Sequence, residues 1–148
     1  MTNQTPGPLD REELMLPVLI RWLKKMHRIS DGTLVAYELP WLGRRVDLVT
    51  MTKRESVTAY ELKRRHIQRA IEQAAANRLA FDRSYIVSGS FPNPANIRTA
   101  AEAGIGLLVL KGDEVVLVLG SPRRAGHSLV RRRLINRVRE RSASNGHV

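Results

Sequence analysis

The sequence predicts an α/β fold built on one mixed β-sheet with helices packed against it. Stretches with helical periodicity alternate with short stretches rich in β-branched and aromatic residues, in the order helix, three strands, helix, strand, helix, two strands, helix. Short polar turns join some strands, which predicts antiparallel hairpins. A helix precedes the strand expected at 83–88, which predicts that this strand lies parallel to its partner.

The composition is that of one globular domain in a reducing compartment. The chain has 148 residues, of which 43% are hydrophobic and 26% charged, and this suits a single core. It contains no Cys, which excludes disulfides and thiolate metal sites. Its start lacks the basic and apolar segments of a signal peptide, and no apolar run approaches membrane-spanning length. We therefore expect a cytoplasmic protein with no membrane partner.

The net charge of +11 is unevenly distributed along the chain. Residues 121–148 contain eight Arg and a single acidic residue, Glu140, whereas the rest of the chain contains 17 basic and 13 acidic residues. A surplus of this size favours a polyanionic partner, with nucleic acid ahead of a membrane surface.

The N-terminal half is predicted to contain one helix and three strands. Residues 1–9 are polar and rich in Pro and Gly, so we expect disorder there. Asp10 and Glu13 form a capping-box-like pair at the helix start. The helix is indicated by apolar residues at three- and four-residue spacing, namely Met15, Leu19, Trp22 and Met26. The strands are expected at 33–39, 45–52 and 57–63, with 40–43 breaking the chain between the first two.

The C-terminal half begins with a helix predicted at 65–81, whose buried face carries Ile67, Ala70, Ile71 and Ala74. The strand at 83–88 and a short helix capped by Asn93 and Gly104 follow. Strands at 105–110 and 114–119 form a hairpin, and a basic helix begins near Ser128, with 142–148 disordered. We therefore divide the chain into a disordered start (1–9), a domain (10–120) and a basic helix and tail (121–148).

Asp47, Glu61 and Lys63 are the candidate catalytic residues. Side chains alternate along a strand, so Glu61 and Lys63 share one face. Thirteen residues separate Asp47 from Glu61, just enough for a tight hairpin that brings both carboxylates to one end of the sheet. Buried charges are costly unless they pair or bind an ion. Taken alone, Glu-x-Lys is a weak signal, because most such pairs are solvated edge-strand charges.

Four further polar residues lie near these positions in the predicted fold. Gln73, on the helix at 65–81, is either a site residue or an ordinary solvated position. Glu12 is more simply explained as a first-turn acid that complements the helix dipole, and Glu38 lies near the end of the first strand. His66 is interpreted as a solvated residue at a helix start and not as a metal ligand.

These residues in this order resemble the PD-(D/E)XK nuclease superfamily. Its pattern is an Asp on one strand, Glu/Asp-x-Lys on the next, and then a helix that often carries a Gln, which Asp47, Glu61-Leu62-Lys63 and Gln73 match. The resemblance covers residues 11–110, and Val46 stands where the family often has Pro. Within the superfamily, the sequence is most similar to small members that resemble Holliday junction resolvases or phage and bacterial phosphodiesterases. The resemblance implies a three-layer αβα fold of the restriction-endonuclease type, with a central mixed sheet.

The resemblance also implies a Mg²⁺-dependent DNA nuclease in which Mn²⁺ can substitute. Asp47, Glu61 and the main-chain carbonyl of Leu62 would hold the metal. An extra carboxylate would come from Glu12 or Glu13 on the first helix, or from Glu38. Lys63 would orient the attacking water or help to deprotonate it, and Gln73 would position Lys63 or the phosphate.

Two basic clusters are expected to bind DNA. One follows the candidate site and the other lies on the final helix; they comprise Arg64, Arg65 and Arg69, and Arg131, Arg132, Arg133 and Arg137. A non-catalytic DNA-binding or regulatory protein that retains the fold is the alternative function. A nuclease subunit targeted by a helicase- or transposase-type partner is a third reading, and a homodimer also remains open.

Overall fold

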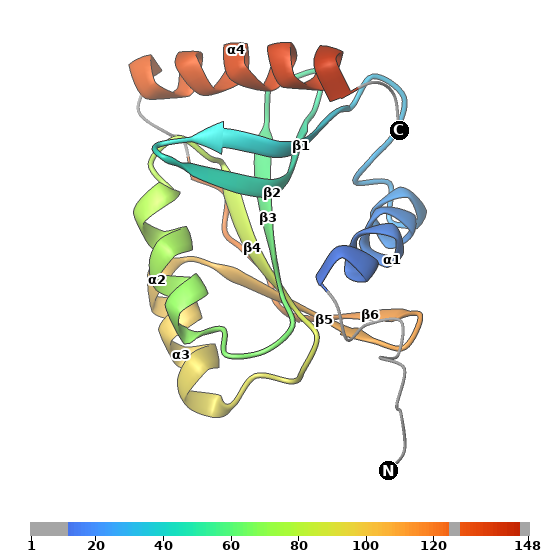
Figure 1. Cartoon of the computed structure of the whole chain (residues 1–148). Helices are drawn as coiled ribbons and strands as arrows, with labels where there is room; N and C mark the ends of the chain where they lie inside the picture. Colours follow the sequence, from blue (N-terminus) through green and yellow to red (C-terminus); the bar gives the residue numbers. More distant parts are fainter. Residues whose placement is uncertain (1–11, 125–127, 146–148) are drawn as a thin grey trace.

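The computed structural model describes residues 12–124 and 128–145. The disorder expected for 1–9 and the cap expected at Asp10 lie outside the described residues. The elements, in order, are α1 (Glu12–Lys25), β1 (Leu34–Trp41), β2 (Arg44–Met51), β3 (Val57–Lys63), α2 (Gln68–Asn77), β4 (Arg83–Ser88), α3 (Pro94–Ala103), β5 (Gly106–Lys111), β6 (Glu114–Leu119) and α4 (Ser128–Asn145) (Figure 1).

One six-stranded mixed sheet organises the described chain, as the sequence predicts. Its spatial order is the chain order, β1-β2-β3-β4-β5-β6. Strands β1, β2 and β3 pair antiparallel, β3, β4 and β5 pair parallel, and β5 and β6 form an antiparallel hairpin. The parallel pairs arise where α2 and α3 carry the chain back to the start of the next strand.

Helices cover both faces of this sheet and produce three layers (Figure 1). On one face, α1 buries Met15, Leu19 and Leu23 against Leu48 and Tyr60. On the other face, α2 and α3 cover β4 and β5, and α4 covers β1, β2 and β3. The α2–α3 core includes Ile71, Ala100, Ile86 and Leu107, and the α4 core includes Leu134, Val138, Val49 and Ala59. Within the described residues, no helix combines the length and apolarity that a bilayer crossing requires.

The regular alternation of side chains breaks in the β1–β2 hairpin. Ala36 and Leu39 both join the α4 core although their positions along β1 differ by an odd number, and Val46 and Val49 do the same on β2. Between the first two lies Glu38, whose φ is +53°. An L-residue adopts this conformation only at a cost, and it rotates the strand that follows. Regular alternation along 45–52 would place Val46 on the same face as Leu48, and the structure instead places Val46 in the α4 core and Leu48 in the α1 core.

Several element ends differ from expectation. β1 continues through Pro40 to Trp41, which is tolerated because β1 is an edge strand. The turn is formed by Leu42 and Gly43, both with positive φ, as a tight hairpin requires. The second helix is shorter than 65–81, and α4 extends to Asn145, so disorder of 142–145 is wrong. Residues 146–148 lie outside the described residues.

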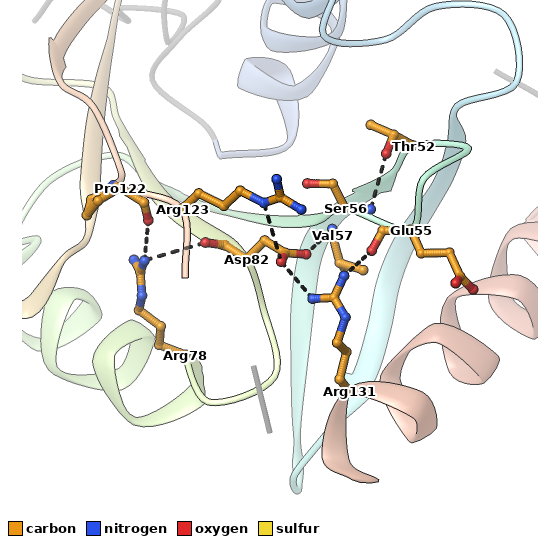
Figure 2. Close-up of polar contacts among 9 residues, drawn as sticks. All are labelled: Thr52, Glu55, Ser56, Val57, Arg78, Asp82, Pro122, Arg123 and Arg131. Carbon is orange, nitrogen blue, oxygen red and sulfur yellow. Dashed lines mark hydrogen bonds and ion pairs between the residues drawn. The ribbon is translucent and has the colours of Figure 1, made fainter. Parts of the chain in front are cut away.

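A buried carboxylate fastens α4 to the centre of the sheet (Figure 2). Asp82, 1% exposed, accepts hydrogen bonds from the Val57 main-chain N–H at 2.7 Å and from Arg131 Nη1 at 2.6 Å. Arg131 also donates to the Glu55 carbonyl. The neighbouring guanidinium of Arg78 donates to the Pro122 carbonyl on the other side of Asp82. These contacts hold the basic helix in a fixed position relative to β3.

Candidate active site

The carboxyl groups of Asp47 and Glu61 meet where β2 leaves β3. The pairing of these strands runs from Met51–Val57 to Leu48–Tyr60, so Asp47 and Glu61 are the next residues on each strand. Directly opposed residues of an antiparallel pair share one face of the sheet. The Leu62 main-chain N–H donates to Asp47 Oδ2 at 2.8 Å, and the two carboxyl groups hydrogen bond to each other.

This environment favours protonation of one of the two carboxyls. Burial is the main cause that raises the pKa of Glu61 to about 8, and the adjacent Asp47 charge raises it further. Burial also raises the pKa of Asp47, although the hydrogen bonds from Leu62 and Glu61 oppose that rise. Burial and the neighbouring charge therefore favour the protonated form of Glu61 at neutral pH.

A small polar pocket of about 190 Å³ opens over this pair. Lys63 lines it from β3, and Gln73 lines it from α2. The buried face of α2 presses Ala70 and Ala74 on to the sheet, and Gln73 lies on the same helix beside the carboxylates. One pocket is therefore lined by all the residues expected to be neighbours, namely Asp47, Glu61, Leu62, Lys63 and Gln73.

Glu12 and Glu38 differ in their relation to this pocket. Glu12, at the first position of α1, lines it, whereas Glu38 faces Asp47 across the β1–β2 hairpin. The negative charge of Glu38 raises the pKa of both site carboxyls, and that of Glu12 raises the pKa of Asp47. Within the described residues, no three His, Asp or Glu side chains surround a common point at metal-binding range. The side chain of Glu13 lies outside the described residues, and His66 is exposed, as expected.

Arg44 is a site residue that sequence reasoning missed. It lines the pocket, its Nη2 donates to Gln73 Oε1 at 3.1 Å, and its charge lowers the pKa of Glu61. Regular alternation assigns Arg44 to the face opposite Asp47, so the pattern gives no signal for it. The break in alternation between Val46 and Val49 removes that restriction.

The donor set suits a hard divalent cation. Burial raises the pKa of both half-buried carboxyls, and a cation bound between them would favour their ionised forms. Asp47 and Glu61 would be its ligands, and the Leu62 carbonyl is a third candidate oxygen because Leu62 lines the pocket.

The basic residues expected to bind DNA fall into two groups. Arg65, Arg69, Arg132, Arg133 and Arg137 are exposed, and Arg64 is half-buried. Arg131 differs, because its guanidinium is bound to Asp82 and to the Glu55 carbonyl within the fold. Arg139 likewise donates to the Glu55 carboxylate, and Arg141 donates to the Tyr37 carbonyl. Arg137 also donates to the Pro40 carbonyl, so four of the six α4 arginines bond to the rest of the fold.

Comparison with known proteins places the fold. No protein-family model matches the chain, and no curated protein matches it. A protein of unknown function from Silicibacter pomeroyi matches with a TM-score of 0.66 and 19% identity, over 97% of this chain and 90% of that one. A repair endonuclease from Pyrococcus abyssi matches with a TM-score of 0.52 and 20% identity, over 69% of this chain but only 48% of the endonuclease. The chain thus has an α/β fold that is also found in a repair endonuclease.

Proposed function

We propose that this protein is a metal-dependent nuclease that hydrolyses phosphodiester bonds in DNA. The observation that carries the proposal is the Asp47–Glu61 carboxyl pair, which the β2–β3 register places side by side in a pocket that Lys63 also lines. Two carboxylates are the usual protein contribution to a Mg²⁺ site that acts on phosphates. The +11 charge and the nuclease-like fold support the same substrate class.

Each site residue has a distinct role in this proposal. Asp47 and Glu61 would hold Mg²⁺, or Mn²⁺ in its place, because both carboxyls line the same pocket. A divalent cation held there would supply charge stabilisation at a scissile phosphate and would help to activate a water for attack. Lys63 orients that water and offsets phosphate charge. The Leu62 N–H fixes the carboxylate of Asp47.

Gln73 and Arg44 act as a positioning pair at the pocket wall. The Gln73 side-chain oxygen accepts from Arg44, which directs the Gln73 amide N–H groups away from Arg44. Those donors are then free to bind a phosphate oxygen or to orient a neighbouring group. The guanidinium of Arg44 adds positive charge beside the carboxylates.

The test is cleavage of a panel of single-stranded, branched and duplex DNAs in Mg²⁺ or Mn²⁺. Asp47→Asn, Glu61→Gln and Lys63→Ala should each remove most cleavage, and their effects should be far from additive because they act in one step. Gln73→Ala should have a milder effect. Glu72→Gln is the matched control, because Glu72 is an exposed carboxylate on α2 next to Gln73.

Calorimetric titration with Mg²⁺ separates this proposal from the non-catalytic alternative. The wild type and Glu72→Gln should bind the cation, and Glu61→Gln should not. A wild-type protein that binds no divalent cation and cleaves none of the DNAs would contradict the enzyme assignment and favour a DNA-binding role.

A further inference from the structure

A groove of about 890 Å³ lies between the β1–β2 turn and α4. Trp41 and Leu42 line it from the hairpin, and Arg44 and Arg45 from the start of β2. Arg133 and Arg137 line it from the helix opposite. It is several times larger than the candidate active-site pocket, and the roles proposed above for the site residues do not use it.

The charge of the groove is strongly positive. Four arginines line it against one carboxylate, Glu140. Unlike Arg131, which is tied to Asp82, the groove residues Arg45, Arg133 and Arg137 are exposed. Arg137 makes only a long contact of 3.3 Å with the Pro40 carbonyl. Like charges held this close repel, and a phosphate backbone would relieve that repulsion.

The hairpin side of the groove offers an apolar surface that the fold does not require. Leu42 is 63% exposed at the tip of the turn, and its φ is +50°. Asn or Gly would relieve the backbone cost at this position, and a polar residue would avoid exposing apolar surface. Leu42 is therefore doubly unfavourable for folding alone, and it lies where a nucleic-acid base could pack on it.

The groove adjoins the candidate active site at Arg44. Arg44 lines both cavities, and its guanidinium bonds to Gln73 in the smaller one. A chain of phosphates leaving the pocket would thus meet Arg44 first and then the arginines of α4.

We propose that this groove holds a single-stranded segment of DNA next to the phosphodiester bound in the pocket. A single-strand site usually combines arginines that bind the phosphates with apolar surface on which the bases pack. A duplex keeps its bases stacked inside and presents phosphates, so it has no use for Leu42. The position of this segment beside a scissile bond rests on the proposed function, and it makes single-stranded or flapped DNA the preferred substrate.

Binding in EDTA tests the groove without requiring cleavage. Fluorescence anisotropy of full-length protein would compare a labelled oligo-dT with a blunt duplex. Arg133→Gln/Arg137→Gln should weaken oligo-dT binding by about tenfold or more near physiological salt. The matched control is Lys24→Gln/Lys25→Gln, which removes the same charge from exposed positions on α1.

Leu42→Asn gives a second test, in which a loss of binding cannot be attributed to a loss of stability. Asn tolerates positive φ better than Leu, so this variant should fold at least as well as the wild type. It should nevertheless bind oligo-dT several-fold more weakly and leave duplex binding unchanged.

Three results would overturn the proposal. The first is an arginine variant that binds oligo-dT as tightly as the wild type does. The second is an arginine variant that loses as much affinity for duplex as for oligo-dT. The third is an α1 control variant that loses as much oligo-dT affinity as the arginine variant. If the wild type cleaves no DNA but both groove variants lose oligo-dT affinity selectively, the nuclease assignment fails and the single-strand site stands.

Discussion

The ionisation of Glu61 is controlled by its burial at the end of β3 and by the neighbouring carboxylate of Asp47. In the unfolded chain this carboxyl titrates near 4.5, and in the folded protein its pKa is about 8. Between these values the folded state holds a proton that the unfolded state has lost. Raising the pH through this window therefore favours unfolding when no divalent cation is present.

We predict that the free energy of unfolding in EDTA falls as pH rises from about 4.5 to about 8. The slope should stay below about 1.4 kcal/mol per pH unit, because solvent partly screens this half-buried group. Urea denaturation at several pH values measures it. Glu61→Gln should flatten the dependence and Glu72→Gln should not. Parallel curves for the wild type and Glu61→Gln would show that Glu61 titrates normally.

Arg131 and Arg132 are sequence neighbours on α4 with opposite environments. Arg131 is 20% exposed and bound to the buried Asp82, whereas Arg132 is exposed. Without Arg131, the buried Asp82 charge would rely on the Val57 N–H and on the exposed guanidinium of Arg123 at 4.0 Å. This weaker compensation makes the loss of Arg131 costly.

We predict that Arg131→Gln lowers the free energy of unfolding by about 3 kcal/mol. Arg132→Gln should change it by less than about 0.5 kcal/mol, as expected for a surface site. Chemical denaturation of both variants at neutral pH is the measurement. Equal, small effects would mean that the Asp82 contact does not hold α4 on the sheet.

The sequence predicted the elements well and their irregularities poorly. Periodicity and turn residues identified all ten elements, and strand spacing brought Asp47 opposite Glu61, because these are local properties of the chain. No residue pattern around Glu38 predicts its positive φ. This φ reverses the alternation of β1 and β2, and so it hid Arg44 from any reading based on regular strands.

The α4 arginines show a related limit. Their composition predicted a polyanion-binding face, but the partner of Arg131 is Asp82, which lies 49 residues earlier in the chain. No sequence pattern distinguishes an arginine that pairs with a distant buried carboxylate from its exposed neighbour. Only the packing of α4 on β1 and β2 makes that distinction.

The distribution of charge over the whole molecule follows the two faces of the sheet. Arg65 and Arg69 accompany α2, and Arg132, Arg133 and Arg137 project from α4, on the face that carries the candidate site. The exposed cations of α1 lie with the opposite face. Deleting α4 cannot test this arrangement, because the deletion would remove Leu134 and Val138 from the core.

Surface substitutions that remove the same number of positive charges from each face test where DNA binds. We predict that Arg132→Gln/Arg133→Gln/Arg137→Gln lowers the slope of log affinity for DNA against log salt by about 0.9 for each arginine that contacts a phosphate. Arg65→Gln/Arg69→Gln should act in the same direction, and the two effects should add because the sites are separate. Arg21→Gln/Lys24→Gln/Lys25→Gln on α1 removes three charges and should leave the slope almost unchanged. Equal losses from both faces would mean that net charge alone, and not the face with the carboxylate pair, determines where DNA binds.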